Sequence, residues 1–262
     1  MAEQTLVKVK GIVTRAVQYK ENDKILTVLT AEYGRISVYC HGAKSNKSKF
    51  LTSCRLFCYS EFVLTKKKDF YYIKEADYIE AFFDIVNSMD KLFLGQYFLE
   101  VINEISVEGE RHDGLLRLLL NSLYALSKDI TESRIIKSAF ELRACVEMGV
   151  SPNLTGCRDC GIVGDDFVYF DILNGNIVCK NCLLLENSGI DGTQAGIYLP
   201  INNSVLVGMQ YVQSTKIERL FSFSLSEQAF ELFFTVCEKY LLNQVGKSFI
   251  TLDLYNEQIK ND

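Results

Sequence analysis

The sequence predicts an α+β protein of several domains: an N-terminal OB-fold β-barrel, then an α-helical domain that carries a four-cysteine zinc ribbon. Three observations lead to this prediction. Short apolar and β-branched runs fill the first eighty residues, apolar side chains then recur at helical spacing, and two Cys-x-x-Cys pairs are separated by eighteen residues. We therefore expect the barrel in residues 1–80 and the helical domain in residues 81–262, with the ribbon inserted at about residues 154–186.

The N-terminal region predicts five strands. Polar segments such as Glu21-Asn22-Asp23 and Glu32-Tyr33-Gly34 separate the apolar runs, as turns separate strands. Residues Ile36 to Cys40 alternate apolar and polar, which is typical of a strand with one buried face. Five short strands in about eighty residues match a small closed barrel, for which the OB fold is the leading candidate. The expected strands are Leu6–Val13, Ile25–Leu29, Ile36–Cys40, Leu56–Leu64 and Phe70–Ile73.

The period of the apolar residues changes after about Tyr78. Between Leu92 and Ile105 they recur at helical spacing and outline one broad apolar face. Ser224 and Glu227 have the spacing of a capping box, in which two side chains satisfy free backbone N–H groups at a helix start. Further helices are expected at Leu115–Leu126, Thr131–Met148, Asn203–Gln213 and Ser224 to about Asn243.

The two cysteine pairs predict a metal site. Their spacing fits the C-x2-C-(x15–20)-C-x2-C pattern of tetrahedral zinc. Asn174-Gly175 between the pairs is a strong hairpin signal, so we expect a β-ribbon to bring the pairs together. Four thiolates leave no open coordination position, so we expect one structural zinc ion. The predicted ligands are Cys157, Cys160, Cys179 and Cys182.

Two other uses of these cysteines remain open. A redox pair of the thioredoxin type needs a single Cys-x-x-Cys, and a disulfide framework is typical of secreted chains. The first residues do not resemble a signal peptide, which argues against secretion. The remaining cysteines have hydrophobic neighbours and are expected in the core; they are Cys40, Cys54, Cys58, Cys145 and Cys237.

Charge is distributed unevenly along the chain. Residues 1–75 contain 14 Lys and Arg and 7 Asp and Glu, a net charge of +7, whereas the rest of the chain has a net charge of −12. A basic module joined to an acidic body suggests that the module binds a polyanion. The alternative is that the lysines are merely solvated and protect strand edges from aggregation.

The best candidate for contact with a polyanion is the basic segment Gly42–Lys49. Its lysines alternate with small and hydroxyl residues, which leave the backbone free to approach a phosphate. The predicted nucleic-acid contacts are Arg35, Lys44, Lys47 and Lys49. Six aromatic residues nearby could stack on unpaired bases, although strands favour them for packing as well; they are Tyr19, Tyr39, Tyr59, Phe70, Tyr71 and Tyr72.

The sequence holds few signs of catalysis. Its two histidines, His41 and His112, stand outside H-E-x-x-H and H-x-E patterns. Gly246-Lys247-Ser248 imitates the end of a phosphate-binding loop, but Leu241 stands where that loop requires glycine. We therefore expect a protein that is not an enzyme. Because no apolar run approaches the roughly 20 residues of a membrane span, we also expect a soluble protein without a membrane partner.

Residues 21–35, ENDKILTVLTAEYGR, contain an E-x-D strand start and a T-x-E-x-G turn, and the basic Gly42-Ala43-Lys44 follows. This pattern resembles the RecO family of bacterial recombinational repair proteins. The order of barrel, helical domain and four-cysteine ribbon agrees with that family as well, so the resemblance covers essentially the whole chain.

The resemblance implies a recombination mediator in DNA repair. RecO proteins bind single- and double-stranded DNA and anneal complementary strands. With RecR they help load RecA onto strands coated by single-strand binding protein, whose acidic C-terminal tail docks on the helical domain. The four predicted basic contacts match basic positions of the family's barrel and loop, and the four paired cysteines match the zinc ligands of members that have them. The implied location is cytoplasmic and nucleoid-associated.

A second function class remains open. A zinc-ribbon transcription or adaptor factor that binds nucleic acid without annealing it would share the barrel, the ribbon and the basic segment. A strand-annealing assay distinguishes the two classes.

Overall fold

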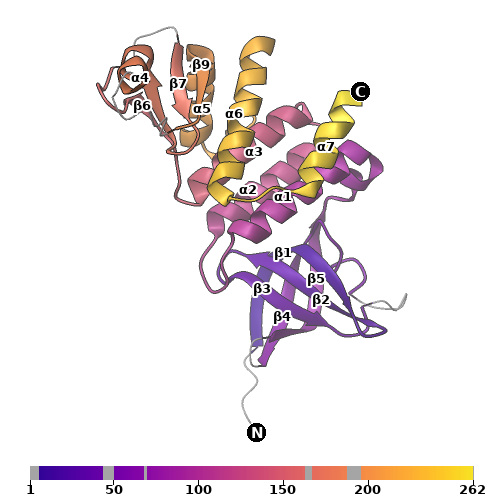
Figure 1. The fold of residues 1–262 in the computed structure, drawn as a ribbon. Helices are drawn as coiled ribbons and strands as arrows, with labels where there is room; N and C mark the ends of the chain where they lie inside the picture. Colours follow the sequence, from indigo (N-terminus) through magenta and orange to yellow (C-terminus); the bar gives the residue numbers. More distant parts are fainter. Residues whose placement is uncertain (1–5, 44–49, 68–69, 163–166, 188–195, 262) are drawn as a thin grey trace. The chain divides into compact units, whose positions relative to one another are not determined.

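A computed structural model describes residues 6–43, 50–67, 70–162, 167–187 and 196–261. The chain divides into two compact units (Figure 1). Unit 1 comprises Met1–Ile130 and Phe249–Asp262, and unit 2 comprises Thr131–Ser248.

Unit 1 begins with a closed β-barrel (Figure 1). Its strand order is β1-β2-β3-β5-β4, and β1 pairs with β4 to close the ring. Strands β3 and β5 pair in parallel, whereas their other pairings and those of the remaining strands are antiparallel. This is the strand order of an OB fold, so the predicted fold class is confirmed. The strands are β1 (Leu6–Tyr19), β2 (Asp23–Thr30), β3 (Gly34–Cys40), β4 (Cys58–Lys67) and β5 (Phe70–Ala81).

The barrel core follows from the period-two pattern of the sequence. In β3, Ile36, Val38 and Cys40 are buried, while Arg35 and Tyr39 are only partly buried and lie on the outer face. Inward residues of the other strands complete one apolar cluster, which includes Val9, Val13, Leu26, Val28, Phe62 and Leu64. The predicted alternation from Ile36 to Cys40 is therefore confirmed.

Two strands, β1 and β5, extend well past their predicted ends. Strand β1 continues past Val13 to Tyr19, with a bulge between Val13 and Arg15, because its pairing with β2 continues to Asp23. Strand β5 continues to Ala81 against β4. Most side chains of these added segments are exposed, apolar ones such as Val17 and Ile79 included, so the segments lack the alternation of buried apolar and exposed polar residues that reveals a strand.

The turn before β3 requires glycine. Gly34 has a φ of +60°, and a Cβ there would collide with the carbonyl oxygen of Val107. A backbone hydrogen bond also forms at this turn: the N–H of Gly109 donates to the carbonyl of Tyr33 (3.0 Å). Gly34 therefore lets the end of helix α1 (Met89–Ile105) and the residues after it pack closely on the barrel within unit 1.

The helices of unit 1 include one segment from the C-terminal end of the chain. In Figure 1, α7 (yellow) lies beside α1 (magenta). The rings of Tyr97 and Phe249 contact edge to face at 5.5 Å, and Thr251 Oγ1 donates to Glu100 Oε2 (2.8 Å). The helices are η1 (Phe83–Asn87), α1 (Met89–Ile105), α2 (Asp113–Ser127) and α7 (Ile250–Asn261). The last barrel strand, β5, ends at Ala81, near the predicted domain boundary at residue 80. The boundary itself remains a prediction, and these helices lie in the same compact unit as the barrel.

Unit 2 combines helices with a four-stranded sheet of order β6-β8-β7-β9. The predicted helices are present, with one correction. Helix α6 begins at Glu227 after the N-cap Ser226, whose side chain makes no capping bond, so the predicted capping box at Ser224 was wrong. The helices are α3 (Ser133–Glu147), α4 (Lys180–Asn187), α5 (Asn203–Ser214), η2 (Ile217–Arg219) and α6 (Glu227–Val245). The strands are β6 (Asn153–Cys157), β7 (Phe167–Asp171), β8 (Asn176–Cys179) and β9 (Tyr198–Asn202).

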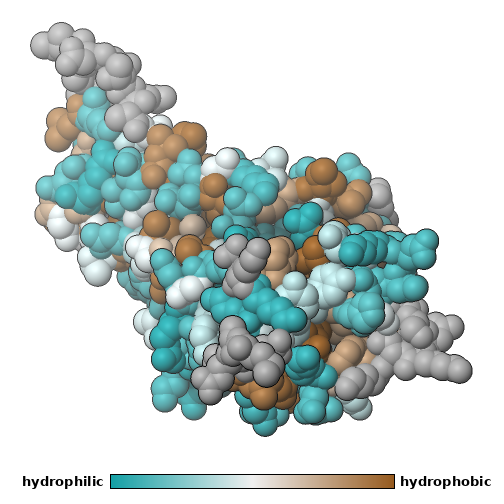
Figure 2. All heavy atoms as spheres, turned by 90° about the horizontal axis from the view of Figure 1, so that it is seen from below, coloured by the Kyte–Doolittle hydropathy of each residue, from teal (hydrophilic) through white to brown (hydrophobic). Residues whose placement is uncertain are grey.

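The described surface is mainly hydrophilic in the view of Figure 2, where hydrophobic residues form small separate groups. Over the residues that the structure describes, none of the helices has the length and apolar character needed to cross a membrane.

Candidate functional site

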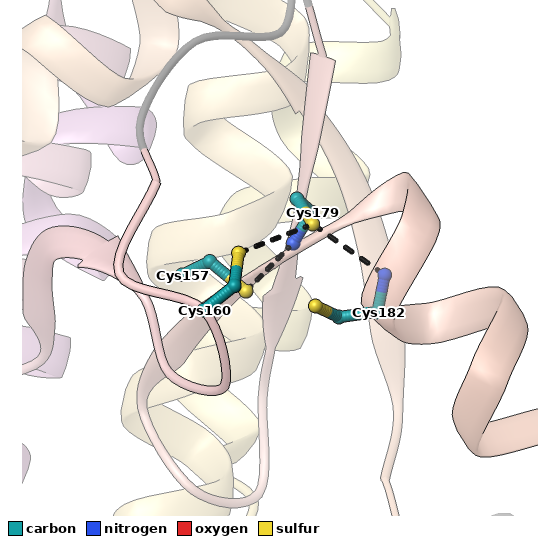
Figure 3. A group of neighbouring side chains, drawn as sticks. All are labelled: Cys157, Cys160, Cys179 and Cys182. Carbon is teal, nitrogen blue, oxygen red and sulfur yellow. Dashed lines mark hydrogen bonds between the residues drawn. The ribbon is translucent and has the colours of Figure 1, made fainter.

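The four paired cysteines come together in unit 2. Their sulfur atoms all lie within 4.8 Å of one another, so the group could hold one metal ion (Figure 3). Cys157 ends β6 and Cys179 ends β8, while Cys160 lies in the turn after β6 and Cys182 in the first turn of α4. Each pair therefore spans the end of a strand and the turn that follows it, as the spacing predicted.

The donor set and its geometry fit a tetrahedral thiolate site. Zn–S bonds of about 2.3 Å place the sulfurs of a tetrahedron about 3.8 Å apart, and Cys160 Sγ lies 3.8 Å from Cys179 Sγ. Backbone N–H groups point at the sulfurs: Cys179 N donates to Cys157 Sγ (3.3 Å) and Cys182 N to Cys179 Sγ (3.4 Å) (Figure 3). Such donors stabilise thiolates.

The pKa of Cys157 shows how these donors act. Burial of the sulfur raises its pKa, but hydrogen bonds from the backbone N–H groups of Cys179, Cys160 and Asp159 outweigh that effect and lower the pKa to about 6. One thiolate is therefore stable near neutral pH before any cation binds.

A hairpin sets the distance between the two Cys-x-x-Cys pairs. Strands β7 and β8 pair from Val168 opposite Cys179 to Asp171 opposite Asn176. The turn between them ends at Gly175, which has a φ of +64° and lies so close to the Tyr240 hydroxyl that a Cβ would collide with it. Tyr240 in turn donates to the carbonyl of Val150 (2.7 Å). The predicted Asn174-Gly175 hairpin is confirmed, and helix α6 fixes its turn.

An ion-pair network that the sequence did not reveal joins the first Cys-x-x-Cys pair to the rest of the ribbon. Arg158, between Cys157 and Cys160, donates to Asp171 Oδ2 (2.9 Å), Glu186 Oε2 (2.5 Å) and the hydroxyl of Tyr198 (3.2 Å). The side chain of Asp171 is fully buried. These partners come from β7, α4 and β9, so no sequence spacing relates them; the one available signal is an Asp before a turn, which often accepts bonds from the turn.

The outer face of the barrel carries the second candidate site. Asp23, at the start of β2, is buried and accepts hydrogen bonds from the Tyr39 hydroxyl and from Gly42 N (2.9 Å). His41 Nδ1 lies 2.9 Å from the same carboxylate. Asp23 thereby fixes the residue at which the chain enters the predicted basic segment.

The pKa values in this group follow from those bonds. The Tyr39 hydroxyl bond, followed by the Gly42 N–H bond, holds the pKa of the Asp23 carboxyl below its usual value. The same bond to Asp23, together with burial, raises the pKa of Tyr39 to about 12. Asp23 therefore stays ionised and Tyr39 protonated at neutral pH, so the bond between them is stable.

The predicted DNA contacts have different outcomes. Lys44, Lys47 and Lys49 lie outside the described residues, so their contacts remain a prediction. Arg35 is partly buried on β3, and its guanidinium donates to the carbonyl oxygen of Asn103 on α1. Arg35 therefore has a structural contact within unit 1, and a role for it in binding DNA also remains a prediction.

The aromatic candidates separate into two groups. Tyr71 is buried and Tyr59 partly buried within the barrel wall, while Phe70 is exposed at the start of β5. In contrast, the ring of Tyr39 contacts those of Tyr19 and Tyr72 on the outer face of the barrel.

Two family models match almost the whole chain. The model described as "Recombination protein O N terminal" matches residues 1–82, which contain the barrel, and "Recombination protein O C terminal" matches residues 86–253. The chain belongs to the RecO family. It is thus a member of a family of DNA repair and recombination proteins, as the sequence resemblance implied.

Individual RecO proteins align along nearly their full length. "DNA repair protein RecO" of Acetivibrio thermocellus is 33% identical over 247 residues, which cover 94% of this chain and 95% of that protein. The proteins of the same name from Caldicellulosiruptor saccharolyticus and Clostridium novyi are each 28% identical, over 95% and 96% of this chain and 97% and 94% of those proteins. The two candidate sites described above therefore lie within the region that aligns with RecO proteins.

Proposed function

We propose that this RecO-family chain is a DNA-binding recombination mediator. It binds single- and double-stranded DNA, anneals complementary strands, and acts with RecR to load RecA onto strands coated by single-strand binding protein. The observation that carries the proposal is a barrel of OB type whose β3 strand leads, through a Gly42 held by Asp23, into a lysine-rich segment.

Electrostatics explains how such a barrel would promote annealing. Two strands repel each other through their phosphates, and lysines that neutralise phosphates release counterions and lower this repulsion. In the proposal, the positive charge comes from Lys44, Lys47 and Lys49. Arg35 would add those guanidinium N–H groups that do not donate to the Asn103 carbonyl. The bases stay free to find a complement because phosphate contacts carry no sequence information.

The proposed activity involves no covalent chemistry. Binding, charge neutralisation and recruitment of partners are sufficient to bring strands together and displace the coat protein. We accordingly propose that the protein is not an enzyme, that the C-terminal tail of single-strand binding protein docks on it, and that it works in the cytoplasm at the nucleoid.

The cysteine group is proposed to bind one structural zinc ion. Cys157, Cys160, Cys179 and Cys182 would provide all four ligands, and such a closed shell leaves no position for substrate or water. When bound, the ion supplies folding energy to the ribbon.

An annealing assay tests the proposed function. Complementary strands coated with single-strand binding protein are mixed with this chain, with and without RecR, and duplex formation is followed by fluorescence quenching. We expect acceleration that falls in the variant Lys44→Ala/Lys47→Ala/Lys49→Ala. The matched control Lys216→Ala/Lys239→Ala/Lys260→Ala removes the same charge from exposed positions outside the barrel and keeps the activity. DNA binding without any acceleration would instead support an adaptor that does not anneal.

A further inference from the structure

Three tyrosines from different strands gather on the outer face of the barrel. Tyr19 ends β1, Tyr39 lies in β3, and Tyr72 lies beside Tyr39 in β5. The ring centroids of Tyr19 and Tyr39 are 5.8 Å apart and those of Tyr39 and Tyr72 are 5.3 Å apart. The planes are inclined by 78° and 48°, so the three rings form a stepped surface rather than a flat one.

These rings are not part of the barrel core. Their chain neighbours Cys40 and Tyr71 point inward and are 0% and 5% exposed, whereas Tyr19 is 43% exposed and Tyr39 and Tyr72 are partly buried. Successive side chains of a strand point to opposite faces, so the three tyrosines must face outward. A contiguous aromatic surface that the core does not need is a mark of a binding site.

Lysines border the surface on both sides. Lys20 Nζ lies 5.5 Å from the centroid of Tyr19, and Lys67 Nζ lies 5.3 Å from that of Tyr72. Both lysine residues are exposed. Aromatic faces beside mobile cations are the combination by which proteins bind single-stranded nucleic acid, since bases stack on the rings and ammonium groups neutralise the phosphates.

Asp23 holds the central ring in place. The Tyr39 hydroxyl donates to Asp23, whose carboxylate also accepts Gly42 N (2.9 Å). Because Asp23 is buried at the start of β2, this bond fixes the orientation of the Tyr39 ring before any ligand arrives. An ordered ring loses less conformational entropy on binding than a free one.

We propose that Tyr19, Tyr39 and Tyr72 form a stacking surface for the unpaired bases of single-stranded DNA, with Lys20 and Lys67 contacting its phosphates. This inference rests on the proposed function and deepens it, because it assigns this face to single strands. Paired bases are stacked inside a duplex and cannot reach the rings. Duplex DNA therefore depends on lysines alone and gains nothing from the tyrosine surface.

The test compares two DNA ligands on the full-length chain. Fluorescence anisotropy measures the Kd of the variant Tyr19→Leu/Tyr72→Leu for oligodeoxythymidine of about 15 nucleotides and for a duplex of the same length. We expect about 10- to 100-fold weaker binding of the single strand, an unchanged Kd for the duplex, and an unchanged salt slope, since no phosphate-binding group is removed. An abasic oligomer of equal length should bind the wild type as weakly as the variant binds oligodeoxythymidine.

Three controls keep the result interpretable. Tyr78→Leu changes an exposed tyrosine elsewhere on β5 (62% exposed) and should leave both affinities unchanged. Tyr39→Phe keeps the ring and removes only the bond to Asp23, so it should weaken single-strand binding less than Tyr39→Leu. Circular dichroism confirms folding, and the single variant Tyr19→Leu replaces the double variant if the latter unfolds.

The outcomes separate the inference from the function on which it rests. Equal Kd values for wild type and the tyrosine variant on the single strand, or an equal loss on both ligands, would overturn the stacking surface while leaving DNA binding intact. A wild-type chain that binds neither ligand would instead refute the proposed function itself.

Discussion

The barrel and the cysteine ribbon are stabilised in different ways. Within the part of the chain that the structure describes, the barrel closes a ring of paired strands around a cluster of thirteen buried residues. Among the described residues, the cluster at the ribbon's paired cysteines has four buried residues, and two of them are Cys157 and Cys179; other apolar side chains of the sheet, such as Phe170 and Ile177, are buried outside this cluster. Small folds with little apolar core depend on metals or other cross-links for stability. The comparison supports the proposal that a bound cation stabilises the part of the ribbon around the paired cysteines, whereas the barrel has an apolar core of its own.

This difference also separates the candidate functions of the two regions. The barrel has a buried apolar core that does not include the tyrosines and lysines of its outer face. These outer residues are therefore available to a ligand. In the ribbon, Arg158, next to Cys157, is instead engaged with Asp171 and Glu186. We therefore propose that the barrel binds DNA and that the ribbon has a structural role.

Loss of a zinc ligand should have the largest effect. Cys179→Ser should abolish metal binding and unfold the ribbon, because structural zinc contributes on the order of 10 kcal/mol to the fold that it holds. Elemental analysis of the metal content and hydrogen exchange across residues 153–202 measure this. The control Cys145→Ala changes a buried cysteine outside the group and should keep one zinc per chain. Wild-type protein without zinc would contradict the proposed site.

Removal of Arg158 should have an intermediate effect. Arg158→Met leaves the buried Asp171 without its cationic partner, although Leu173 N and Asn174 Nδ2 still donate to it (3.0 and 2.7 Å). We expect a loss of about 2 kcal/mol, typical of a hydrogen bond to a charged group, measured by urea unfolding of unit 2.

An exposed pair provides the matched control for Arg158. Arg111→Met breaks a surface pair with Asp113 and should change stability by less than about 1 kcal/mol. Equal effects of the two substitutions would show that Arg158 does not brace the ribbon.

The contribution of the Asp23 carboxylate to the pH dependence of stability should be the smallest of these effects. Asp23 has a folded-state pKa below its unfolded value, so its contribution is complete above about pH 4 and is lost as the pH falls through the folded-state pKa. Wild type should therefore lose more thermal stability between neutral pH and pH 3 than Asp23→Asn does. Calorimetry at several pH values measures the difference. Asp84, whose pKa is also lowered, is present in both proteins and cancels.

Local patterns in the sequence were sufficient to predict the architecture. Alternation revealed the strands, helical periodicity revealed α1, α2, α3 and α5, and cysteine spacing identified the four residues that come together. Helix α7 was not predicted, although Phe249, Leu252 and Tyr255 are buried at helical spacing.

Features that depend on tertiary contact could not be predicted. The partners of Arg158 lie 13, 28 and 40 residues away on three different elements. The tyrosine surface likewise depends on β3 pairing with β5, which brings Tyr39 and Tyr72 together across 33 positions of sequence. The sequence supplied six aromatic candidates of equal standing, and only the strand register selects three of them.

The most direct test of barrel-based DNA binding is the salt dependence of single-strand affinity. Titrations at several salt concentrations compare wild type, Lys44→Ala/Lys47→Ala/Lys49→Ala and the ribbon variant Cys179→Ser. We predict that the slope of log K against log salt falls by about 0.7 for each phosphate that the lysine variant no longer neutralises. The slope should stay at the wild-type value in Cys179→Ser. An unchanged slope in the lysine variant, or an equal fall in the ribbon variant, would contradict the assignment of DNA binding to the barrel.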